Sequence, residues 1–386
     1  MKPLEGFRVL DLTHVLAGPC ATHHLRCLGA EVIKIERPDT GDPMRDLATR
    51  PALNGVPPGF RALNVGKRSV VLDLSTETGR TALLELVKGA DILVENFRPG
   101  VMRRLGLGPD ALHAIQPRLI YCSISGWGQS GARSQQGAYD HVVQAASGMM
   151  MLQSGARDPV KVGYPVIDIA TGMSAAEAIL AATVRRLRGD ASPITIDVAM
   201  IDSALALMSG HAAATVATGE APKRVGNRGF VGSPGADTFS TSDGYISVAA
   251  NTMKQFARLC EVIGRPDLAA PPYIPAGLAP DAFLSDLATD VLQRELAAAF
   301  GRRRADDLEA RLGEAGIPAA RVRDLKEFLS ELYRQTPGID IAGEAGVFGP
   351  AFRFDGDRPL ELPPAPMLGA DTIATLAKAD GATARL

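Results

Sequence analysis

The sequence predicts an α/β protein with a large, doubly wound parallel sheet and a second, smaller α/β domain. Strand patterns alternate with helical patterns from residue 8 to about residue 216, which is typical of a parallel sheet built from βαβ units. The pattern changes at residues 219–244, which are rich in Gly, Pro, Ser and Asn and indicate a linker. With 386 residues, 46% hydrophobic and 22% charged, the chain is long enough for two domains with ample cores.

The first domain begins with a βαβ unit. Residues 8–12 (RVLDL) and 31–36 (EVIKIE) are predicted to form buried strands around a helix at 18–29. A Gly- and Pro-rich loop at 38–66 separates this unit from the next strand. Apolar runs and helical periodicity predict further strands at 69–74, 91–97, 119–125 and 194–199, and further helices at 76–89, 101–105, 109–115, 140–151, 173–188 and 201–216.

The second domain is predicted to contain a strand at residues 245–250 and helices near 253–263, 282–300 and 302–315. From about residue 330 the chain is rich in loops, with short strand-like pieces such as 351–354. We therefore expect a large domain at 1–218, a linker and small domain at 219–330, and a C-terminal segment at 331–386 that returns to the large domain.

Charge and cysteine content narrow the class of protein. The formal charge is −2, from 41 basic and 43 acidic residues, so neither nucleic acid nor a membrane surface is an expected partner. The four cysteines have no CxxC spacing and the six histidines no metal-ligand spacing, so no metal site is expected. Charged residues interrupt the N-terminal segment, so no signal peptide is expected. These features indicate a cytoplasmic protein with reduced thiols.

Residues 126–131 (GWGQSG) match the G-x-G-x-x-G pattern of dinucleotide-binding sites and follow a predicted strand. In such sites a helix begins within the motif, so that its N-terminus meets the pyrophosphate. Here residues 132–138 still have the composition of a loop, and no acidic residue ends a strand about 20 residues later. We therefore expect a loop that covers another ligand, and no nicotinamide or flavin site.

Basic residues follow several of the predicted strands. In a doubly wound sheet the loops after the strands share the edge at which ligands bind. Arg and Lys side chains that converge there would bind phosphates, although an ordinary solvated surface remains the alternative. His14, at the end of the first strand, is placed to join such a site. The basic residues concerned are Lys34, Arg37, Lys67, Arg68, Arg98, Arg103 and Arg104.

Asp168 is the only charged residue in the apolar run 162–172. Burial of an unpaired charge costs free energy, so a carboxylate in such a run is expected to have a structural or functional role. The run is predicted to be extended as far as Asp168, to turn at Thr171–Gly172 and to continue as the helix at 173–188. A carboxylate at such a junction can project into a cleft, but by itself this window favours an ordinary helix-capping Asp.

Several long segments in order resemble the family III CoA transferases, the CaiB/BaiF group that includes formyl-CoA transferase. They are VLDLTHVLAGP (9–19), LGAEVIKIERPDTGDPMR (28–45), GKRSVVLDL (66–74), ADILVENFRPGVMRRLGLG (90–108), LIYCSISGWGQSG (119–131) and YDHVVQAASG (139–148). The resemblance implies a large Rossmann-like domain, a small domain and a homodimer whose two chains interlock like links. It also implies coenzyme A or acyl-CoA as a substrate, with no permanently bound cofactor.

The resemblance reverses the interpretation of Asp168, because the catalytic Asp of the family lies in a segment that matches PVIDIATG (165–172). Formyl-CoA transferase has Gln where this chain has Leu16 and Lys where it has Ser75, and only Gly232–Gly235 stands where it has a run of glycines. Formate and oxalate are therefore not the expected acids. The family's CoA contacts map onto His14, Ala17, Arg37, Leu72, Asn96, Phe97, Arg98, Arg104, Ala138 and Tyr139.

The α-methylacyl-CoA racemases also resemble this chain and share the Asp. Their catalytic His aligns with Tyr139, and their catalytic Glu falls near Met253, so this chain lacks both groups. The prediction is therefore a CoA transferase that moves CoA from an acyl-CoA, with succinyl-CoA as a suitable donor, to a free carboxylic acid. Asp168 would form an acyl anhydride and then an aspartyl-CoA thioester. A racemase and a non-catalytic CoA-binding protein remain the alternatives, and the acids themselves are not predicted.

Overall fold

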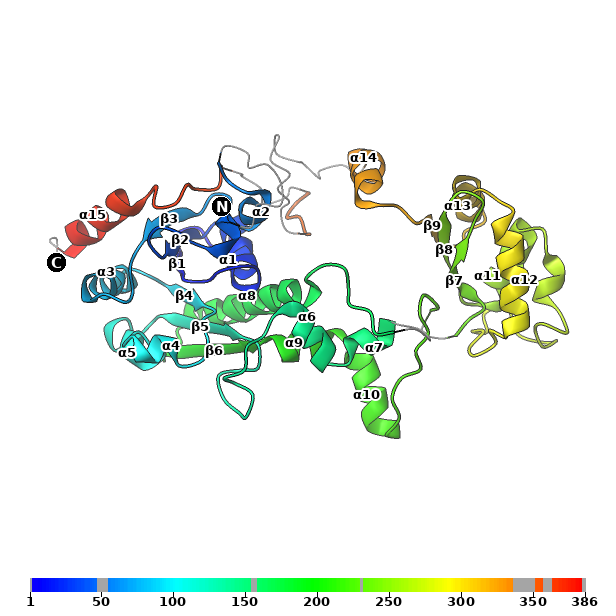
Figure 1. Ribbon diagram of the computed structural model, residues 1–386, viewed down its shortest axis with the longest axis horizontal. Helices are drawn as coiled ribbons and strands as arrows, with labels where there is room; N and C mark the ends of the chain where they lie inside the picture. Colours follow the sequence, from blue (N-terminus) through cyan, green and yellow to red (C-terminus); the bar gives the residue numbers. More distant parts are fainter. Residues whose placement is uncertain are drawn as a thin grey trace. The chain divides into compact units, whose positions relative to one another are not determined.

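The computed structural model describes residues 2–46, 55–153, 158–229, 232–335, 351–356 and 363–383. The chain divides into two compact units (Figure 1). The first consists of Met1–Met149, Val162–Thr218 and Gly338–Leu386, and the second of Met150–Lys161 and Gly219–Pro337. The sequence had placed residues 150–161 in the large domain, whereas their contacts group them with the second unit.

The first unit is built on a six-stranded parallel sheet in the order β3-β2-β1-β4-β5-β6. Each of the six predicted strands is present, and the expectation of a parallel sheet is confirmed. This order reverses direction between β1 and β4, which start the two halves of the sheet. The strands are β1 (Arg8–Asp11), β2 (Glu31–Glu36), β3 (Arg68–Val71), β4 (Ile92–Glu95), β5 (Ile120–Ser125) and β6 (Ile194–Ala199).

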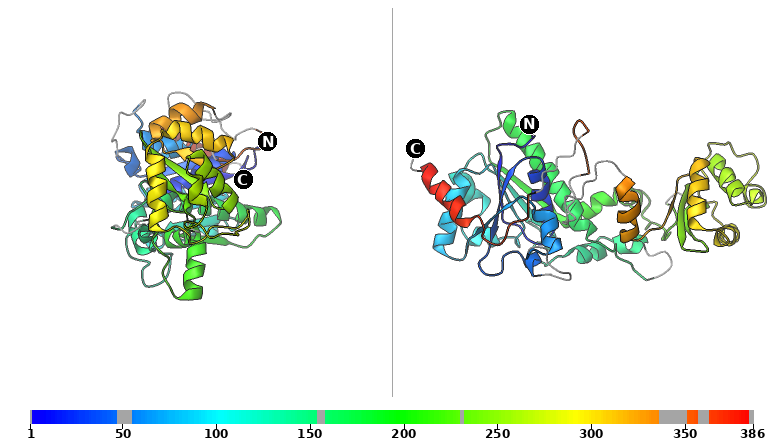
Figure 2. Two further views of the ribbon diagram at one scale, coloured as in Figure 1. Left: turned by 90° about the vertical axis from the view of Figure 1, so that its right-hand side faces the viewer. Right: turned by 90° about the horizontal axis from the view of Figure 1, so that it is seen from above.

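Helices cover both faces of this sheet (Figures 1 and 2). Because side chains alternate along a strand, Val9 packs under α1 (Ala17–Cys27) and α8 (Val166–Leu187), while Leu10 packs on the opposite face. That opposite face is covered by α3 (Glu77–Lys88), α4 (Val101–Arg104) and α5 (Pro109–Ile115). The other helices of this unit are η1 (Pro43–Arg45), α2 (Pro58–Asn64), α6 (Asp140–Ala146), α9 (Met200–Leu207), α10 (Ser209–Thr218) and α15 (Thr372–Thr383), and α7 (Met149–Gln153) runs into the second unit.

Helices α1 and α8 pack unusually closely at Gly172. A Cβ atom there would lie 2.6 Å from both the Ala17 carbonyl oxygen and the Cys20 Cβ atom, so only glycine fits. By length and composition α8 would also fit across a bilayer, a test that core helices of globular proteins pass as well. Here α8 packs against α1, β5 and β6.

The last described part of the chain, residues 369–383, lies on the outer edge of β3, beside α3 (Figures 1 and 2). The Asp371 amide donates to the Ser69 carbonyl at 2.9 Å, and the Val71 amide donates to the Thr372 hydroxyl at 3.0 Å. These bonds satisfy backbone groups that an open edge strand would leave to solvent.

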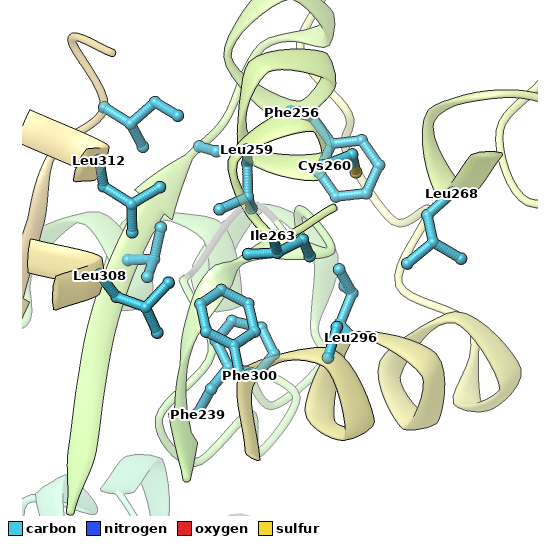
Figure 3. Packing of buried hydrophobic residues seen from close by; sticks show 14 of the residues in the cluster. Phe239, Phe256, Leu259, Cys260, Ile263, Leu268, Leu296, Phe300, Leu308 and Leu312 are labelled. Atoms are coloured by element: carbon cyan, nitrogen blue, oxygen red, sulfur yellow. The ribbon is translucent and has the colours of Figure 1, made fainter. Parts of the chain in front are cut away.

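The second unit contains an antiparallel sheet of β7 (Gly235–Ser240), β8 (Tyr245–Ala250) and β9 (Ala319–Arg321). Its core lies between this sheet and three helices, α11 (Met253–Val262), α12 (Asp290–Gly301) and α13 (Ala305–Glu314). Figure 3 shows Phe239 of β7 stacked on Phe300 of α12, with ring centroids 4.2 Å apart. This unit also contains η2 (Pro266–Ala269) and α14 (Leu325–Gln335).

Several predicted boundaries were wrong. The linker predicted at 219–244 contains β7, which pairs with β8 and buries Phe239. The helix predicted at 282–300 begins only at Asp290, where the Thr289 hydroxyl accepts a hydrogen bond from the Leu292 amide. Residues 351–354 form no strand, and the predicted loop at 38–66 contains η1 and α2. The run predicted to be extended as far as Asp168 is already helical from Val166, and the turn predicted at Thr171–Gly172 also lies within α8.

Candidate active site

The loops after β1 and β4 meet where the strand order reverses, the position at which open α/β sheets bind ligands. Asn96 joins the two loops: its side-chain oxygen accepts from the His14 amide at 2.9 Å, and its side-chain nitrogen donates to the His14 carbonyl at 2.8 Å. The Phe97 ring packs edge-on against the His14 ring, with centroids 4.9 Å apart. The backbone at this junction is therefore held in place before any ligand binds.

A cavity of about 420 Å³ opens at this junction, and Asp168 lies in its wall. The wall combines the loops after β1, β4 and β5 with α8, and most of its side chains are apolar. A cavity of this size and character is suited to a small-molecule ligand. The lining residues are His14, Val15, Leu16, Ala17, Asn96, Phe97, Arg98, Pro99, Val101, Ile124, Ser125, Gly126, Ser134, Gln136, Gly137, Ala138, Tyr139, Asp168 and Met200.

Asp168 is the third residue of α8, and the start of this helix is held by Asp140. One carboxylate oxygen of Asp140 accepts from the Ile167 amide at 2.6 Å and from the Asp168 amide at 3.1 Å. The other oxygen accepts from the Gln144 side chain, whose own oxygen accepts from the Val162 amide at 2.8 Å. Because Asp140 supplies the cap from 28 residues away, nothing in the run 162–172 predicts this helix start.

The carboxyl group of Asp168 is only partly exposed. Burial raises its pKa, and the nearby Asp140 carboxylate raises it further, to about 7. A carboxylate with so high a pKa is a stronger nucleophile than an ordinary Asp and still ionises near neutral pH. Strongly shifted carboxylates inside cavities are candidates for catalysis.

A second cavity, of about 360 Å³, lies on the other side of His14 and Phe97, which line both cavities. Its wall includes Arg37 and Leu72. One elongated ligand could therefore contact both cavities along the strand ends, with an anionic part near Arg37. Of the predicted site residues, Arg104 lies outside both cavities, on the exposed surface of α4.

Part of the interpretation of the basic residues was wrong. Lys34 and Lys67 are fully buried and form ion pairs, Lys34 with Asp42 at 3.0 Å and Lys67 with Asp11 at 2.9 Å. Arg68 pairs with Glu31 at the opposite end of the strands, because both residues begin their strands. These three side chains therefore serve the fold and do not face a ligand at the cavity edge.

The loop at 126–139 contains no helix, as predicted, and forms one side of the Asp168 cavity. The Gln129 amide donates to the Asp197 carboxylate at 2.9 Å, which ties this loop to the end of β6. The Arg133 guanidinium lies over the ring of Trp127. His141 is exposed and stacks on Tyr139, so it does not replace the histidine of the racemases in the cavity.

Sequence reasoning missed several residues that build the site. Asp140 and Asp42 orient the walls of the cavity through backbone amides, and Val15 lies in its wall with a left-handed φ of 68°. Ser125 lines the cavity with a buried hydroxyl. A Ser at a strand end followed by Gly126 is a weak signal, and the roles of the two Asp residues depend on contacts distant in sequence.

The fold and site define a protein with two adjoining cavities along the strand ends and a carboxyl group of raised pKa in the wall of one of them. The profile of CoA-transferase family III matches residues 4–372, so the chain belongs to this family and is a CoA transferase. The resemblance stated from the sequence motifs is confirmed.

Curated relatives support this assignment. The chain is 34% identical to the succinyl-CoA:glutarate CoA-transferase of Mus musculus, over 96% of this chain and 85% of the relative. It is 37% identical to the acetyl-CoA:oxalate CoA-transferase of Acetobacter aceti, over 95% and 93% of the two chains. The crystal structure of a CAIB/BAIF family protein from Brucella suis superposes with a TM-score of 0.87 at 32% identity, covering 98% of this chain and all of that one.

Proposed function

We propose that the protein moves CoA from an acyl-CoA thioester to a free carboxylic acid through covalent intermediates on Asp168. The observation that carries this proposal is the position of Asp168: a partly buried carboxyl group of raised pKa, in an apolar cavity, on a helix start held by Asp140. Such an arrangement suits a nucleophile whose acyl products must be kept from water.

The proposed sequence has four steps, each with a defined leaving group. The Asp168 carboxylate attacks the thioester carbonyl, the C–S bond breaks, and CoA leaves as the thiolate from a mixed anhydride. The thiolate attacks the Asp168 carbonyl and expels the donor acid, which leaves an aspartyl-CoA thioester. The acceptor carboxylate attacks this thioester and releases the thiolate with a second anhydride. The thiolate then attacks the acceptor carbonyl, which yields the new acyl-CoA and free Asp168.

The two cavities suggest how CoA would lie. The pantetheine arm and thioester would occupy the cavity of Asp168, between Asn96–Arg98 and Ala138–Tyr139, and the nucleotide end would occupy the second cavity near Arg37 and Leu72. His14 and Phe97 would contact the ligand where the cavities adjoin. Arg98 supplies a positive charge in the cavity wall, which would suit succinyl-CoA as a donor with a second carboxylate.

The direct test is a covalent adduct. Incubation with acyl-CoA, followed by mass spectrometry of the digested protein, should show a CoA or acyl adduct on the peptide that contains Asp168. Hydroxylamine should trap the same position. Asp168→Ala should lose both the adduct and the transferase activity. An Asp168→Ala variant with full activity would refute the mechanism.

The same experiments separate the alternatives. A racemase would exchange deuterium at the α-carbon of a 2-methylacyl-CoA without an acceptor acid. A non-catalytic protein would bind CoA without turnover. A screen of succinate, glutarate, itaconate, mesaconate, malate and oxalate as acceptors, with succinyl-CoA and acetyl-CoA as donors, would identify the acids.

The proposed functional form is a homodimer of interlocked chains. Apolar side chains are exposed along α8 at Met173, Val184 and Leu187, and none of the residues of α10 is buried in the single chain. A second copy that covers these surfaces would remove large apolar side chains from water. Light scattering after size-exclusion chromatography should give twice the chain mass of 40.6 kDa, and a mass of one chain would contradict this proposal.

A further inference from the structure

Asp42 is a buried carboxylate that lines the second cavity and accepts a hydrogen bond from Val15, which lines the first. One of its oxygens accepts from the Val15 amide at 3.2 Å and from the Met44 amide at 2.9 Å. The other lies 3.0 Å from the ammonium group of Lys34, and neither side chain is more than 1% exposed. Asp42 therefore connects the segment after β2 with the loop after β1.

The loop after β1 needs such support, because Val15 has a φ of 68°. A β-branched residue rarely adopts this left-handed conformation, and it persists only where surrounding contacts impose it. Lys34 donates to the Thr13 carbonyl at 2.6 Å, and Asn96 holds both backbone polar groups of His14. The Val15 amide, in turn, donates to Asp42, so three successive residues of this loop are held by hydrogen bonds. Val15 lines the cavity of Asp168.

The segment after β2, which carries Asp42, lines the second cavity. Asp42 lines that cavity together with Arg37, Gly41 and Pro43, which belong to one short segment. Hydrogen bonds hold the segment: Arg37 Nε donates to the Gly41 carbonyl at 3.1 Å, the Gly41 amide donates to the Arg37 carbonyl at 3.3 Å, and the Asp42 amide donates to Glu36 at 3.1 Å. A ligand in the second cavity would therefore contact the segment that positions Asp42.

We propose that Asp42 is a positioning residue that couples binding of the nucleotide end of CoA in the second cavity to the geometry of Val15 and Leu16 beside Asp168. This inference rests on the proposed function, because it requires CoA to occupy both cavities. Its consequence is that contacts made by the nucleotide, far from the reacting bond, raise kcat and do not merely lower KM.

The test combines a shortened substrate with a variant. The acyl-CoA donor that forms the Asp168 adduct fastest is chosen first. Its rate is then compared with that of the pantetheine thioester of the same acyl group, which lacks the nucleotide. In the wild type, the maximal rate of adduct formation should be about tenfold or more higher with the CoA thioester, the scale of a typical coupling between sites. In Asp42→Asn this ratio should fall to about one, because nucleotide contacts in the second cavity can no longer act on Val15, whereas weaker support of the loop lowers the rates of both thioesters alike.

Two further variants make the result specific. Asp39→Asn makes the same charge change in the same segment, at a φ of 63° that asparagine tolerates, and should keep the wild-type ratio. Asp42→Glu keeps a negative charge beside Lys34, so the buried lysine stays paired, but it moves the oxygens away from the Val15 amide. The ratio of the rates with the CoA and pantetheine thioesters should therefore also fall to about one. Circular dichroism checks that both Asp42 variants are folded.

The inference is overturned if the ratio in Asp42→Asn and Asp42→Glu equals the wild-type ratio, whether or not both rates fall, since Asp42 would then have a purely structural role. It is also overturned if the wild type itself shows no preference in maximal rate for the CoA thioester. Failure of the proposed function is a different result, because then no thioester would form an adduct on wild-type Asp168.

Discussion

The high pKa of Asp168 predicts that this residue destabilises the folded protein at neutral and alkaline pH. Asp168→Asn replaces the carboxyl group by a neutral amide of nearly the same shape. If Asp168 is the proposed nucleophile, the variant should be inactive as a transferase, and it should be more stable than the wild type above pH 7, because the carboxylate is held in an unfavourable environment. The free energy of unfolding of this variant reports the cost of the buried charge, and its transferase activity reports the chemical role of the carboxylate.

The size of the effect follows from the pKa. The value rises from 3.8, ordinary for an Asp, to about 7 in the folded protein. At about 1.4 kcal/mol per pKa unit this corresponds to about 4 kcal/mol, and solvent at the cavity surface reduces it to about 2–4 kcal/mol. Below pH 3.8 the carboxyl group is protonated in both states and costs nothing. Between pH 3.8 and 7 the unfolded chain binds fewer protons, so the penalty on folding grows, and above pH 7 it is constant.

The assay is urea unfolding at several pH values from 4 to 9, followed by the fluorescence of Trp127, the single tryptophan. Protein concentration is kept constant, because association would change the apparent stability. Asp202→Asn is the matched control, since Asp202 is the third residue of α9, as Asp168 is of α8, and is exposed. The difference between Asp168→Asn and wild type should grow with pH, and that of the control should not. Equal differences at pH 4 and pH 9 would refute the reasoning.

Three further predictions concern the same helix. Wild-type adduct formation should rise with pH through about 7 and be lost as Asp168 becomes protonated below it, which a pH–rate profile checks. Asp140→Asn removes the charge that raises the pKa of Asp168, so the midpoint of this profile should move to lower pH, and an unchanged midpoint would contradict the role of Asp140. Gly172→Ala should cost about 1–3 kcal/mol in urea unfolding, because its Cβ would meet the Ala17 carbonyl, whereas Gly313→Ala on α13, with nothing within 4 Å, should be neutral or stabilising; equal effects would refute the close packing of α1 and α8.

Much of the first unit could be predicted from local patterns. Runs rich in apolar residues, such as 8–12 and 119–125, locate strands that are buried on both faces, and the connecting helices follow from their periodicity. Boundaries that depend on distant groups were missed. The start of α8 depends on a carboxylate in α6, and β7 is a strand because β8 lies beside it.

In the candidate site too, local motifs predicted some residues, and others depend on tertiary contacts. The motif around Asp168, and the positions after β1, β4 and β5, can be recognised in the sequence, and the structure places His14, Asn96, Phe97 and Asp168 around one cavity. The charge pattern alone was misleading for Lys34 and Lys67. Whether a lysine faces a ligand or a buried carboxylate depends on strand register, which composition does not reveal.

The sequence by itself therefore determined the class of fold and the family, and it pointed to Asp168 as the candidate nucleophile, because these depend on periodicity and on motifs that are local in the chain. The tertiary structure decided which charges are available for function. Asp11 and Lys67 neutralise each other across 56 residues, and Asp140 reaches 28 residues to the start of α8, where it holds Asp168 and raises its pKa. Burial and proximity set these energies, and both exist only once the chain has folded.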